Sequence, residues 1–361
     1  MSELQQAGCD VIAVCKPQSK IEAYLLSRGI RCEHLPVYKK ISPASLKYIA
    51  GLLRRHNVDV VHVHFHTDIW MASLALRHNR QIRLFLSIYM GVIKKNDILH
   101  RWIYRRVDTF FTSSSELNRR LPDLYPISKE KIRYLSYGRR LDLYSSNDAE
   151  RKAVRSRFGI RDTELLVGTM VRVDPGKGVI DFARSFLYLA EEQRQNVKYL
   201  IIGEPTRKGS AKPGESPFEP HCVEYLREIE EYVQQHKLED NILFAGYQED
   251  AITFLRGMDV FVFPSRDELY SLVMLDAMAM GLPVVAARAG GNLLQVDDGR
   301  NGLLYTVGDS RDLASNITRY LTHPDERLRH GAAAQQFVGE HHDMNATVAQ
   351  LMELYQQERI S

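Results

Sequence analysis

The chain has 361 residues, of which 44% are hydrophobic and 26% charged, and a formal net charge of +3 at pH 7. These fractions are typical of soluble globular proteins, and they exclude a disordered or fibrous chain. The length suits two domains of about 150 to 200 residues each. Two domains imply a cleft in which a ligand can bind.

The charge is unevenly distributed along the chain. Residues 1–150 carry 24 Lys and Arg against 14 Asp and Glu, whereas the remainder carries 24 against 31. A basic N-terminal half faces either an anionic partner, such as a phospholipid surface or a phosphorylated substrate, or only solvent, and both alternatives stay open. We expect no nucleic-acid partner, because no recognition motif accompanies the positive charge.

The cysteines and the N-terminus indicate the compartment. Cys9, Cys15, Cys32 and Cys222 form no Cys-x-x-Cys pair, so reduced thiols are expected. No apolar run reaches the roughly 20 residues that cross a bilayer, and the opening sequence MSELQQAGCD does not resemble a signal peptide. We therefore predict a cytoplasmic protein, with peripheral association at the inner membrane face left open.

Short β-branched runs alternate with longer amphipathic stretches along the whole chain, which is typical of parallel sheets covered by helices. The predicted strands of the first half are 10–15, 58–64, 83–88, 109–112 and 132–135. Those of the second half are 165–171, 198–202, 242–245, 260–263 and 283–286. Two doubly wound α/β domains are predicted, 1–150 and 151–340, and a last helix within 341–361 is expected to return to the first domain.

Two segments between these strands carry alternatives. Residues 92–107 are basic, and Ile98, Leu99, Trp102, Ile103 and Val107 are predicted to share one helix face. This face suits either an anionic lipid surface or packing on the first sheet. Residues 204–221 are rich in Pro, Gly and charge, which indicates a loop after a strand, either a lid over the ligand or a surface excursion.

Two familiar motifs are excluded by residue count, and a metal site is disfavoured because it lacks ligand partners. The segment PGKGVID at 175–181 has Asp181 where a dinucleotide fingerprint needs a third Gly, and a P-loop would need Gly in place of Val171 and Ser or Thr in place of Gly178. His62, His64 and His66 alternate as metal ligands on one strand face would, but no Cys or carboxylate stands at ligand spacing. We expect neither an NAD or ATP enzyme nor a metal site.

The informative stretch is 244–302. Its strand VFVFPS ends in a polar loop, and a helix is predicted to begin near Ser271 and to end at a Gly-Leu-Pro stop. A free helix N-terminus favours an anion. Glu268 precedes that helix and Asp276 lies on it, and carboxylates accept hydroxyl hydrogen bonds from sugars. Arg172 and Lys177 follow the strand 165–171 and suit a diphosphate at the same sheet edge.

As a set, these residues resemble the donor half of glycosyltransferase family 4, retaining enzymes of GT-B fold. The matching parts are Arg172, Lys177-Gly178, Pro264-Ser265, Glu268 and Asp276 with seven residues between them, AMAMGLPVVA at 277–286, Gly290-Gly291, Asp298-Gly299 and Asn301-Gly302. The resemblance covers roughly 160–355 strongly and 55–145 weakly. It implies two Rossmann-like domains that face each other across a cleft.

The resemblance also implies a role for each site residue. Arg172 and Lys177 bind the donor pyrophosphate, backbone N–H groups at Ser271 and Leu272 bind the distal phosphate, Glu268 meets the sugar and Asp276 meets the ribose. The leaving phosphate takes the acceptor's proton, the anomeric configuration is retained, and no metal or other cofactor is expected.

Three departures from the family pattern lie near the catalytic cleft. The family's first strand and Gly-rich turn are missing from the start of this chain, which implies either a truncated reading of a longer gene or a lost part of the acceptor side. Tyr89 stands where the family commonly has a His that touches the donor sugar, so Tyr89 is predicted to contact sugar as a hydrogen-bond donor. Asp276 replaces the family's second Glu and is shorter by one methylene.

The predicted function is transfer of a sugar from a nucleotide-diphosphate donor to a glycan or lipid-linked acceptor, as in lipopolysaccharide, capsule or exopolysaccharide assembly. Two alternatives stay open: a catalytically impaired donor-binding remnant or partner subunit, and a sugar-nucleotide epimerase of the same architecture. The nucleotide base, the sugar, the acceptor and the oligomeric state are not fixed by the sequence.

Overall fold

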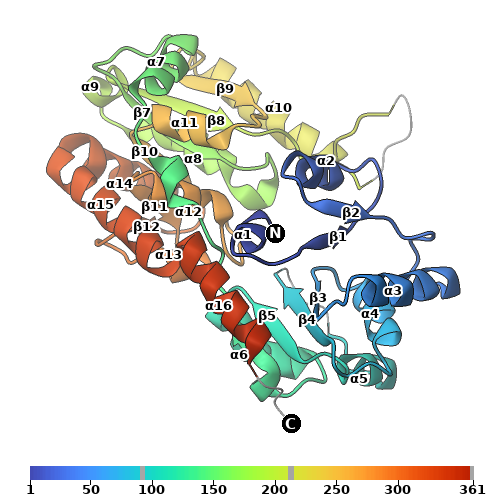
Figure 1. The fold of residues 1–361 in the computed structure, drawn as a ribbon. Coiled ribbons are helices and arrows are strands. Elements are labelled where there is room, and N and C mark those ends of the chain that lie inside the picture. The colour runs from blue at the N-terminus through green and yellow to red at the C-terminus, as the bar shows by residue number, and fades with distance from the viewer. Residues whose placement is uncertain (90–93, 210–214, 358–361) are drawn as a thin grey trace. The chain divides into compact units, whose positions relative to one another are not determined.

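The computed structural model describes residues 1–89, 94–209 and 215–357 (Figure 1). By its internal contacts the chain divides into unit 1, Met1–Gly138 with Met344–Ser361, and unit 2, Arg139–Asp343. The boundaries expected from sequence, 150/151 and 340/341, stay predictions of where independently folding domains begin and end. Each unit is described by itself below.

Unit 2 contains one six-stranded parallel sheet in the order β12-β11-β10-β7-β8-β9. Its strands are β7 (Leu165–Met170), β8 (Val197–Ile202), β9 (Ile242–Gly246), β10 (Val260–Phe263), β11 (Val284–Ala287) and β12 (Gly302–Tyr305). The chain runs outward from β7 to β9 on one side and from β10 to β12 on the other. The strand order therefore reverses between β7 and β10, which is where doubly wound sheets bind ligands, at the carboxyl ends of the strands.

Helices cover both faces of this sheet because its strands are apolar on both sides. The helices of unit 2 are α7 (Asp148–Arg157), α8 (Val179–Ser185), α9 (Glu191–Arg194), α10 (Pro220–Gln235), α11 (Ala251–Gly257), α12 (Leu272–Ala279), α13 (Asn292–Gln295), α14 (Ser310–Thr322) and α15 (Pro324–His341). The largest core cluster joins strand residues such as Val167, Tyr199 and Val262 to Phe182 of α8 and Ile229 of α10. The sheet is thus a rigid frame for the loops at its edge.

Unit 1 contains two separate parallel sheets. The larger has the order β3-β4-β5-β6, with β3 (Val60–Val63), β4 (Arg83–Ile88), β5 (Thr109–Thr112) and β6 (Ile132–Tyr134). The smaller pairs β1 (Ile12–Val14) with β2 (Arg31–Glu33). The helices are α1 (Ser2–Gln6), α2 (Lys20–Ser27), α3 (Pro43–Arg55), α4 (Ile69–Ala75), α5 (Ile98–Tyr104), α6 (Ser115–Leu124) and α16 (Met344–Gln356). Leu354 of α16 packs on Phe85 and Phe111 of the larger sheet.

The ten predicted strands are all present, with ends that differ by at most a few residues. Two further strands were not predicted. β2 is only three residues long, Arg-Cys-Glu, and carries no hydrophobic alternation. β12 follows a Gly-rich turn, and the sequence analysis used this turn only as part of the family resemblance. Both are short, and short strands are specified by their neighbours more than by their own residues.

The prediction for the basic segment 92–107 was wrong in one respect. Residues 92 and 93 lie outside the described residues, and α5 covers only Ile98–Tyr104, so Val107 is not on the helix. The five apolar side chains do not share one environment. Ile103 and Val107 are buried, whereas Ile98, Leu99 and Trp102 are 84%, 62% and 40% exposed. The segment therefore packs on its own unit and also presents an apolar edge to solvent.

Candidate functional site

A hollow of about 330 Å³ lies in unit 2 at the point where the strand order reverses. Two of its walls are loops that leave the carboxyl ends of β7 and β10. Its lining consists of Met170, Val171, Arg172, Lys177, Phe263, Glu268, Tyr270, Ser271, Leu272 and Val273. Five of the residues predicted from sequence thus meet at one place, although almost 100 positions separate the first from the last.

Lys177 and Glu268 form the charged pair of this hollow. The Lys177 Nζ lies 2.8 Å from Glu268 Oε2 and 3.3 Å from the Ser265 hydroxyl. Both side chains are partly buried, at 15% and 24% exposure, so the pair is held rather than free in solvent. The ammonium of such a pair can also bind a phosphate, and the carboxylate can accept hydroxyl hydrogen bonds.

The turn that carries Lys177 is a short 3-10 helix, Pro175–Lys177, fixed at both ends. At its start, the Asp174 carboxylate accepts the N–H of Gly176 at 2.9 Å. At its end, Gly178 has φ +64°, and a Cβ there would lie 2.3 Å from the carbonyl oxygen of Pro264. Only glycine fits that approach of the β7 and β10 loops. The close contact brings Lys177 to the Glu268 loop.

A pair of glycines, Gly290 and Gly291, fixes the position of the Glu268 loop. The N–H of Gly291 donates to the Glu268 carbonyl oxygen at 2.7 Å, and a Cβ on Gly291 would lie 2.0 Å from the carbonyl oxygen of Leu269. The Gly290-Gly291 signature therefore has a structural reason: any side chain at Gly291 would push the loop away.

The N-terminus of α12 points into the same hollow, which Ser271 and Leu272 line. The Ser271 hydroxyl accepts the N–H of Met274 at 3.2 Å as a helix cap. The Ser271 backbone N–H, predicted to bind the distal phosphate, donates at 2.8 Å to the side chain of Gln295. Leu272 is the first residue of α12, so its N–H has no acceptor within the helix, and it has none elsewhere among the described residues. This N–H can therefore bind an anion.

Asp276 lies one turn further along α12 and outside the lining of the hollow. Its Oδ1 is 2.5 Å from Arg139 Nε and accepts the Tyr144 hydroxyl at 2.6 Å. Burial and the nearby carboxylate of Asp276 raise the pKa of Tyr144, so this hydroxyl remains a donor. Sequence reasoning missed both partners, because they precede Asp276 by more than 130 positions and belong to no motif.

Tyr89 belongs to unit 1 and directly follows β4. Its ring lies 5.4 Å from that of Tyr137 and 6.4 Å from that of His64. Burial raises the pKa of Tyr89, which makes it a still weaker base at neutral pH. The structure therefore favours hydrogen bonding over proton abstraction for this hydroxyl.

The alternating histidines lie in the same unit and form no three-ligand group among the described residues. His62 is hydrogen-bonded to Tyr355 at 2.6 Å and to Ser87 at 2.7 Å. His66 stacks on Tyr125. Burial lowers the pKa of His62 and lowers that of His66 to about 4, so both imidazoles are neutral at pH 7.

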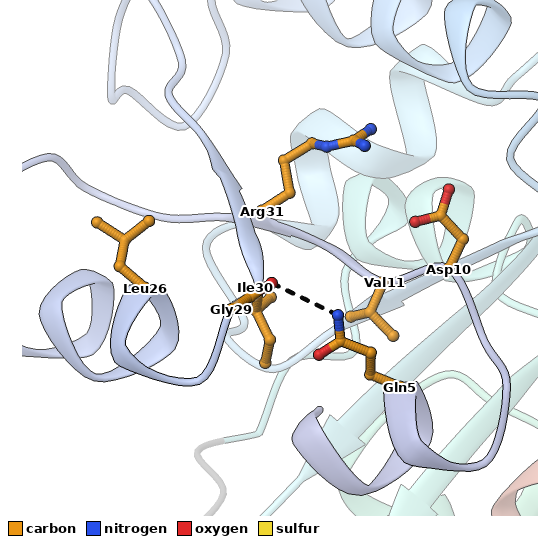
Figure 2. Close-up of a pocket in the computed structure, with 7 residues that line it drawn as sticks. All are labelled: Gln5, Asp10, Val11, Leu26, Gly29, Ile30 and Arg31. Atoms are coloured by element: carbon orange, nitrogen blue, oxygen red, sulfur yellow. Dashed lines mark hydrogen bonds between the residues drawn. The ribbon is translucent and has the colours of Figure 1, made fainter.

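Unit 1 has a hollow of its own, of about 360 Å³, between α1, α2 and β2 (Figure 2). Gln5 reaches across it and donates to the Gly29 carbonyl oxygen at 3.4 Å. Its two charged residues, Asp10 and Arg31, are surface groups, and none of the predicted site residues lines it. We therefore place the candidate site in unit 2.

Comparison with known proteins identifies the class to which this fold and site belong. A family model described as "Glycosyl transferases group 1" matches residues 150–337, and one described as "Glycosyltransferase Family 4" matches residues 1–143. The chain therefore belongs to the group 1 glycosyltransferases of family 4.

Curated relatives and solved structures agree with this assignment. D-inositol 3-phosphate glycosyltransferase of Stackebrandtia nassauensis is 28% identical over 63% of this chain and 49% of its own length. Mannosylfructose-phosphate synthase of Agrobacterium fabrum is 30% identical over 50% of this chain and 37% of its own. These matches thus span half of the relatives' length or less.

Two solved structures share the fold. A glycosyltransferase from Rickettsia africae superimposes with a TM-score of 0.82 at 17% identity, covering 98% of this chain and 91% of its own. The Anabaena protein HepE, in complex with UDP and glucose, superimposes with a TM-score of 0.75 at 19% identity, covering 96% and 92%. The fold is GT-B. Within the described ranges, no helix combines the length and apolarity that crossing a membrane requires.

Proposed function

We propose that the chain transfers a sugar, with retention, from a nucleotide-diphosphate donor to a glycan or lipid-linked acceptor, as in lipopolysaccharide, capsule or exopolysaccharide assembly. The observation that carries this proposal is the meeting of Arg172, Lys177 and Glu268 at the hollow where the strand order of unit 2 reverses. Family membership and the UDP and glucose bound by HepE support it.

Each residue has a role that its position suits. Arg172 and Lys177 neutralise the diphosphate as it leaves, and the N–H of Leu272 adds a dipole of the same sign. Glu268 accepts hydrogen bonds from the sugar hydroxyls. Asp276 accepts hydrogen bonds from the ribose hydroxyls and shares its carboxylate between the ribose, Arg139 and Tyr144. The leaving phosphate takes the acceptor's proton, so the proposed transfer needs no metal ion.

The test is turnover by the purified full chain. UDP-, GDP- and ADP-sugars are incubated with lipid-linked and glycan acceptors, and the released nucleotide and the product are measured. One donor is expected to yield product, and Glu268→Ala to abolish it. Glu239→Ala, on the surface of the same unit, is the matched control. Donor binding without any product or nucleotide release would contradict the proposal.

We also propose that unit 1 binds an anionic lipid surface through the apolar edge of α5. Ile98, Leu99 and Trp102 are exposed, and Lys94, Lys95 and Arg101 lie beside them in sequence. The Arg77 guanidinium lies 4.5 Å from the Trp102 ring. Apolar side chains flanked by cations suit the boundary between headgroups and acyl chains.

Vesicle sedimentation tests this binding. The chain is expected to sediment with phosphatidylglycerol-containing vesicles and not with pure phosphatidylcholine, and Leu99→Ser is expected to weaken sedimentation. Leu328→Ser in unit 2 removes an equally exposed leucine, at 68%, and is expected to change nothing. Equal sedimentation of both variants would contradict the role of α5.

A further inference from the structure

Three side chains with soft and hard ligand atoms meet beside the donor hollow. Asp174 follows β7 and begins the turn that carries Lys177, while His221 and Cys222 stand in the first turn of α10, after the long loop from β8. Their candidate ligand atoms all lie within 4.8 Å of one another, and among the described residues this is the one such group of three. None of its members was assigned a role by the sequence motifs.

The backbone brings the two segments together independently of these side chains. β7 and β8 are adjacent parallel strands, and their pairing continues beyond them as a bridge between Val173 and Pro205. The two ends of the β8 loop are also tied, because the Glu219 N–H donates to the Thr206 carbonyl oxygen at 2.8 Å. The group of three is thus held by ordered backbone on either side of residues 210–214.

The distances from the Cys222 sulfur to the other two ligand atoms match those of tetrahedral coordination. Cys222 Sγ lies 3.4 Å from Asp174 Oδ2 and 3.3 Å from His221 Nε2. A tetrahedral zinc ion with a thiolate and lighter N or O ligands separates S from N or O by about 3.5 Å, given the usual bond lengths. Small shifts of the three side chains would therefore suffice to coordinate an ion.

Neighbouring groups fix the orientation of Asp174 by hydrogen bonds to its carboxylate, as groups around metal ligands commonly do. Asp174 Oδ1 accepts the Gly176 N–H at 2.9 Å, which leaves Oδ2, the atom that also accepts the Thr206 hydroxyl at 3.2 Å, facing the thiol. Burial opposes ionisation of this carboxyl, but hydrogen bonds from Gly176, Cys222 and Thr206 lower the pKa of Asp174 overall. Cys222 is fully buried and His221 is exposed, so the group is closed on one side and open to water on the other.

We propose that Asp174, His221 and Cys222 bind a zinc-type divalent cation, with water in the fourth position. Binding converts the Cys222 thiol to a thiolate and releases its proton to solvent. The ion has a structural role and takes no part in the sugar-transfer reaction. It holds the loop after β8 against the turn that carries Lys177.

Cobalt absorption is the direct test, since a cobalt–thiolate bond gives a charge-transfer band that carboxylate and imidazole ligands do not give. Chelator-treated full chain is titrated with Co²⁺ and, by calorimetry, with Zn²⁺. One equivalent is expected to bind and to produce the band. Cys222→Ser is expected to abolish the band, and Cys32→Ser, a matched thiol of unit 1, to keep it.

Two further variants separate coordination from folding. His221→Ala changes an exposed residue, so it is expected to keep the thermal unfolding midpoint of the metal-free chain while Zn²⁺ affinity falls at least about tenfold. Thr206→Val removes an orienting hydroxyl and is expected to weaken binding by about tenfold. Zn²⁺ affinity should also fall as the pH is lowered, because protons compete for the imidazole and the thiolate.

The outcome does not depend on the proposed transferase activity, because these measurements use no nucleotide. Cobalt bound without the thiolate band, or Zn²⁺ affinity unchanged in His221→Ala, would overturn the metal site and leave the donor site untouched. A chain that shows the cobalt band but binds no nucleotide would overturn the donor site and leave the metal site untouched.

Discussion

The two units differ in how their parallel sheets are built. Unit 2 has six strands in one continuous sheet, and its predicted donor residues stand where the order of that sheet reverses. Unit 1 has four strands in one sheet, while β1 and β2 pair with each other over a small cluster of Ala13, Leu25 and Ile30. An isolated strand pair is marginally stable. The proposed donor site therefore stands on one continuous sheet, and nucleotide binding should be insensitive to the N-terminal strand pair.

The largest effect on nucleotide binding is expected from Lys177→Ala. This change removes one of the two cations proposed to bind the donor diphosphate and leaves the partly buried Glu268 without its Lys177 partner. A hydrogen bond to a charged group contributes about 1.5 to 3 kcal/mol, or roughly 10- to 100-fold in Kd. Calorimetric titration with nucleoside diphosphates measures it.

The matched control for that variant is Lys152→Ala, on the exposed surface of α7 in the same unit. It is expected to bind nucleotide as the parent chain does. Equal weakening in both variants would show that general charge, and not the pairing in the hollow, determines affinity.

The next effect is expected from Gly291→Ala, which tests whether the Glu268 loop is as rigid as the frame suggests. The new Cβ would meet the Leu269 carbonyl oxygen at 2.0 Å, so the backbone must shift. Such overpacking costs about 1 to 3 kcal/mol of unfolding free energy. Thermal unfolding and nucleotide titration should both show the loss.

Gly339→Ala provides the contrast, because it adds the same methyl group in α15 where no atom lies within 4 Å. It is expected to leave nucleotide binding unchanged and to stabilise the helix slightly. A stable, fully binding Gly291→Ala variant would break the rigid-loop interpretation.

A smaller and more selective effect is expected from Asp276→Asn. The amide keeps the shape but loses the charge paired with Arg139, and a ribose hydroxyl would lose a charge-assisted bond. Nucleoside diphosphate affinity should fall by roughly tenfold. Inorganic pyrophosphate affinity should not change, and a parallel loss for pyrophosphate would place Asp276 at the phosphates instead of the ribose.

Acidification is expected to act next, and mainly on unit 1, although burial also lowers the pKa of His330 in unit 2. Unit 1 contains His62, His64 and His66, whose pKa values are lowered chiefly by burial, that of His66 to about 4. Because these values lie below the ordinary 6.5, the neutral rings stabilise the folded unit above pH 6.5, and this contribution is lost as the pH falls toward 4. Amide exchange in unit 1 should therefore accelerate on acidification.

His62→Gln is the informative variant, since glutamine can keep hydrogen bonds to Tyr355 and Ser87 without titrating. It should flatten the pH dependence of exchange, whereas His78→Gln, at the surface of unit 1, should not. An unchanged pH profile in His62→Gln would remove His62 as a cause.

Leu25→Ala is last in this order, because it is expected to have no effect on nucleotide binding. Leu25 is 7% exposed in the small cluster under β1 and β2, so its truncation should loosen that segment and speed its amide exchange. Nucleotide affinity should remain that of the parent chain. A fall in affinity would show that the strand pair supports the donor site after all.

The sequence predicted those features that depend on local pattern. Strand cores such as Val260–Phe263, the cap at Ser271 and the glycine at 178 follow from residues that lie side by side in the chain. Partners distant in sequence escaped prediction. Arg139 and Tyr144 reach Asp276, Gln295 takes the Ser271 N–H, and Asp174 meets Cys222, all through contacts that only the folded sheet creates.

The division of the α5 segment between solvent and core could not be predicted for a related reason. Helical periodicity groups side chains by angle, but the end of α5 at Tyr104 and the packing of its own unit decide which of them are buried. The sequence therefore left both a surface and a packed environment open, and the structure divides the five side chains between them.

Nucleotide titration of the full chain tests the central claim most directly. With UDP, GDP and ADP in separate calorimetric experiments, at least one is predicted to bind in a one-to-one complex that Lys177→Ala weakens. Glu268→Ala is predicted to weaken binding of the corresponding nucleotide sugar. Binding of none of the three by a folded chain would contradict the assignment of the unit 2 hollow as a donor site.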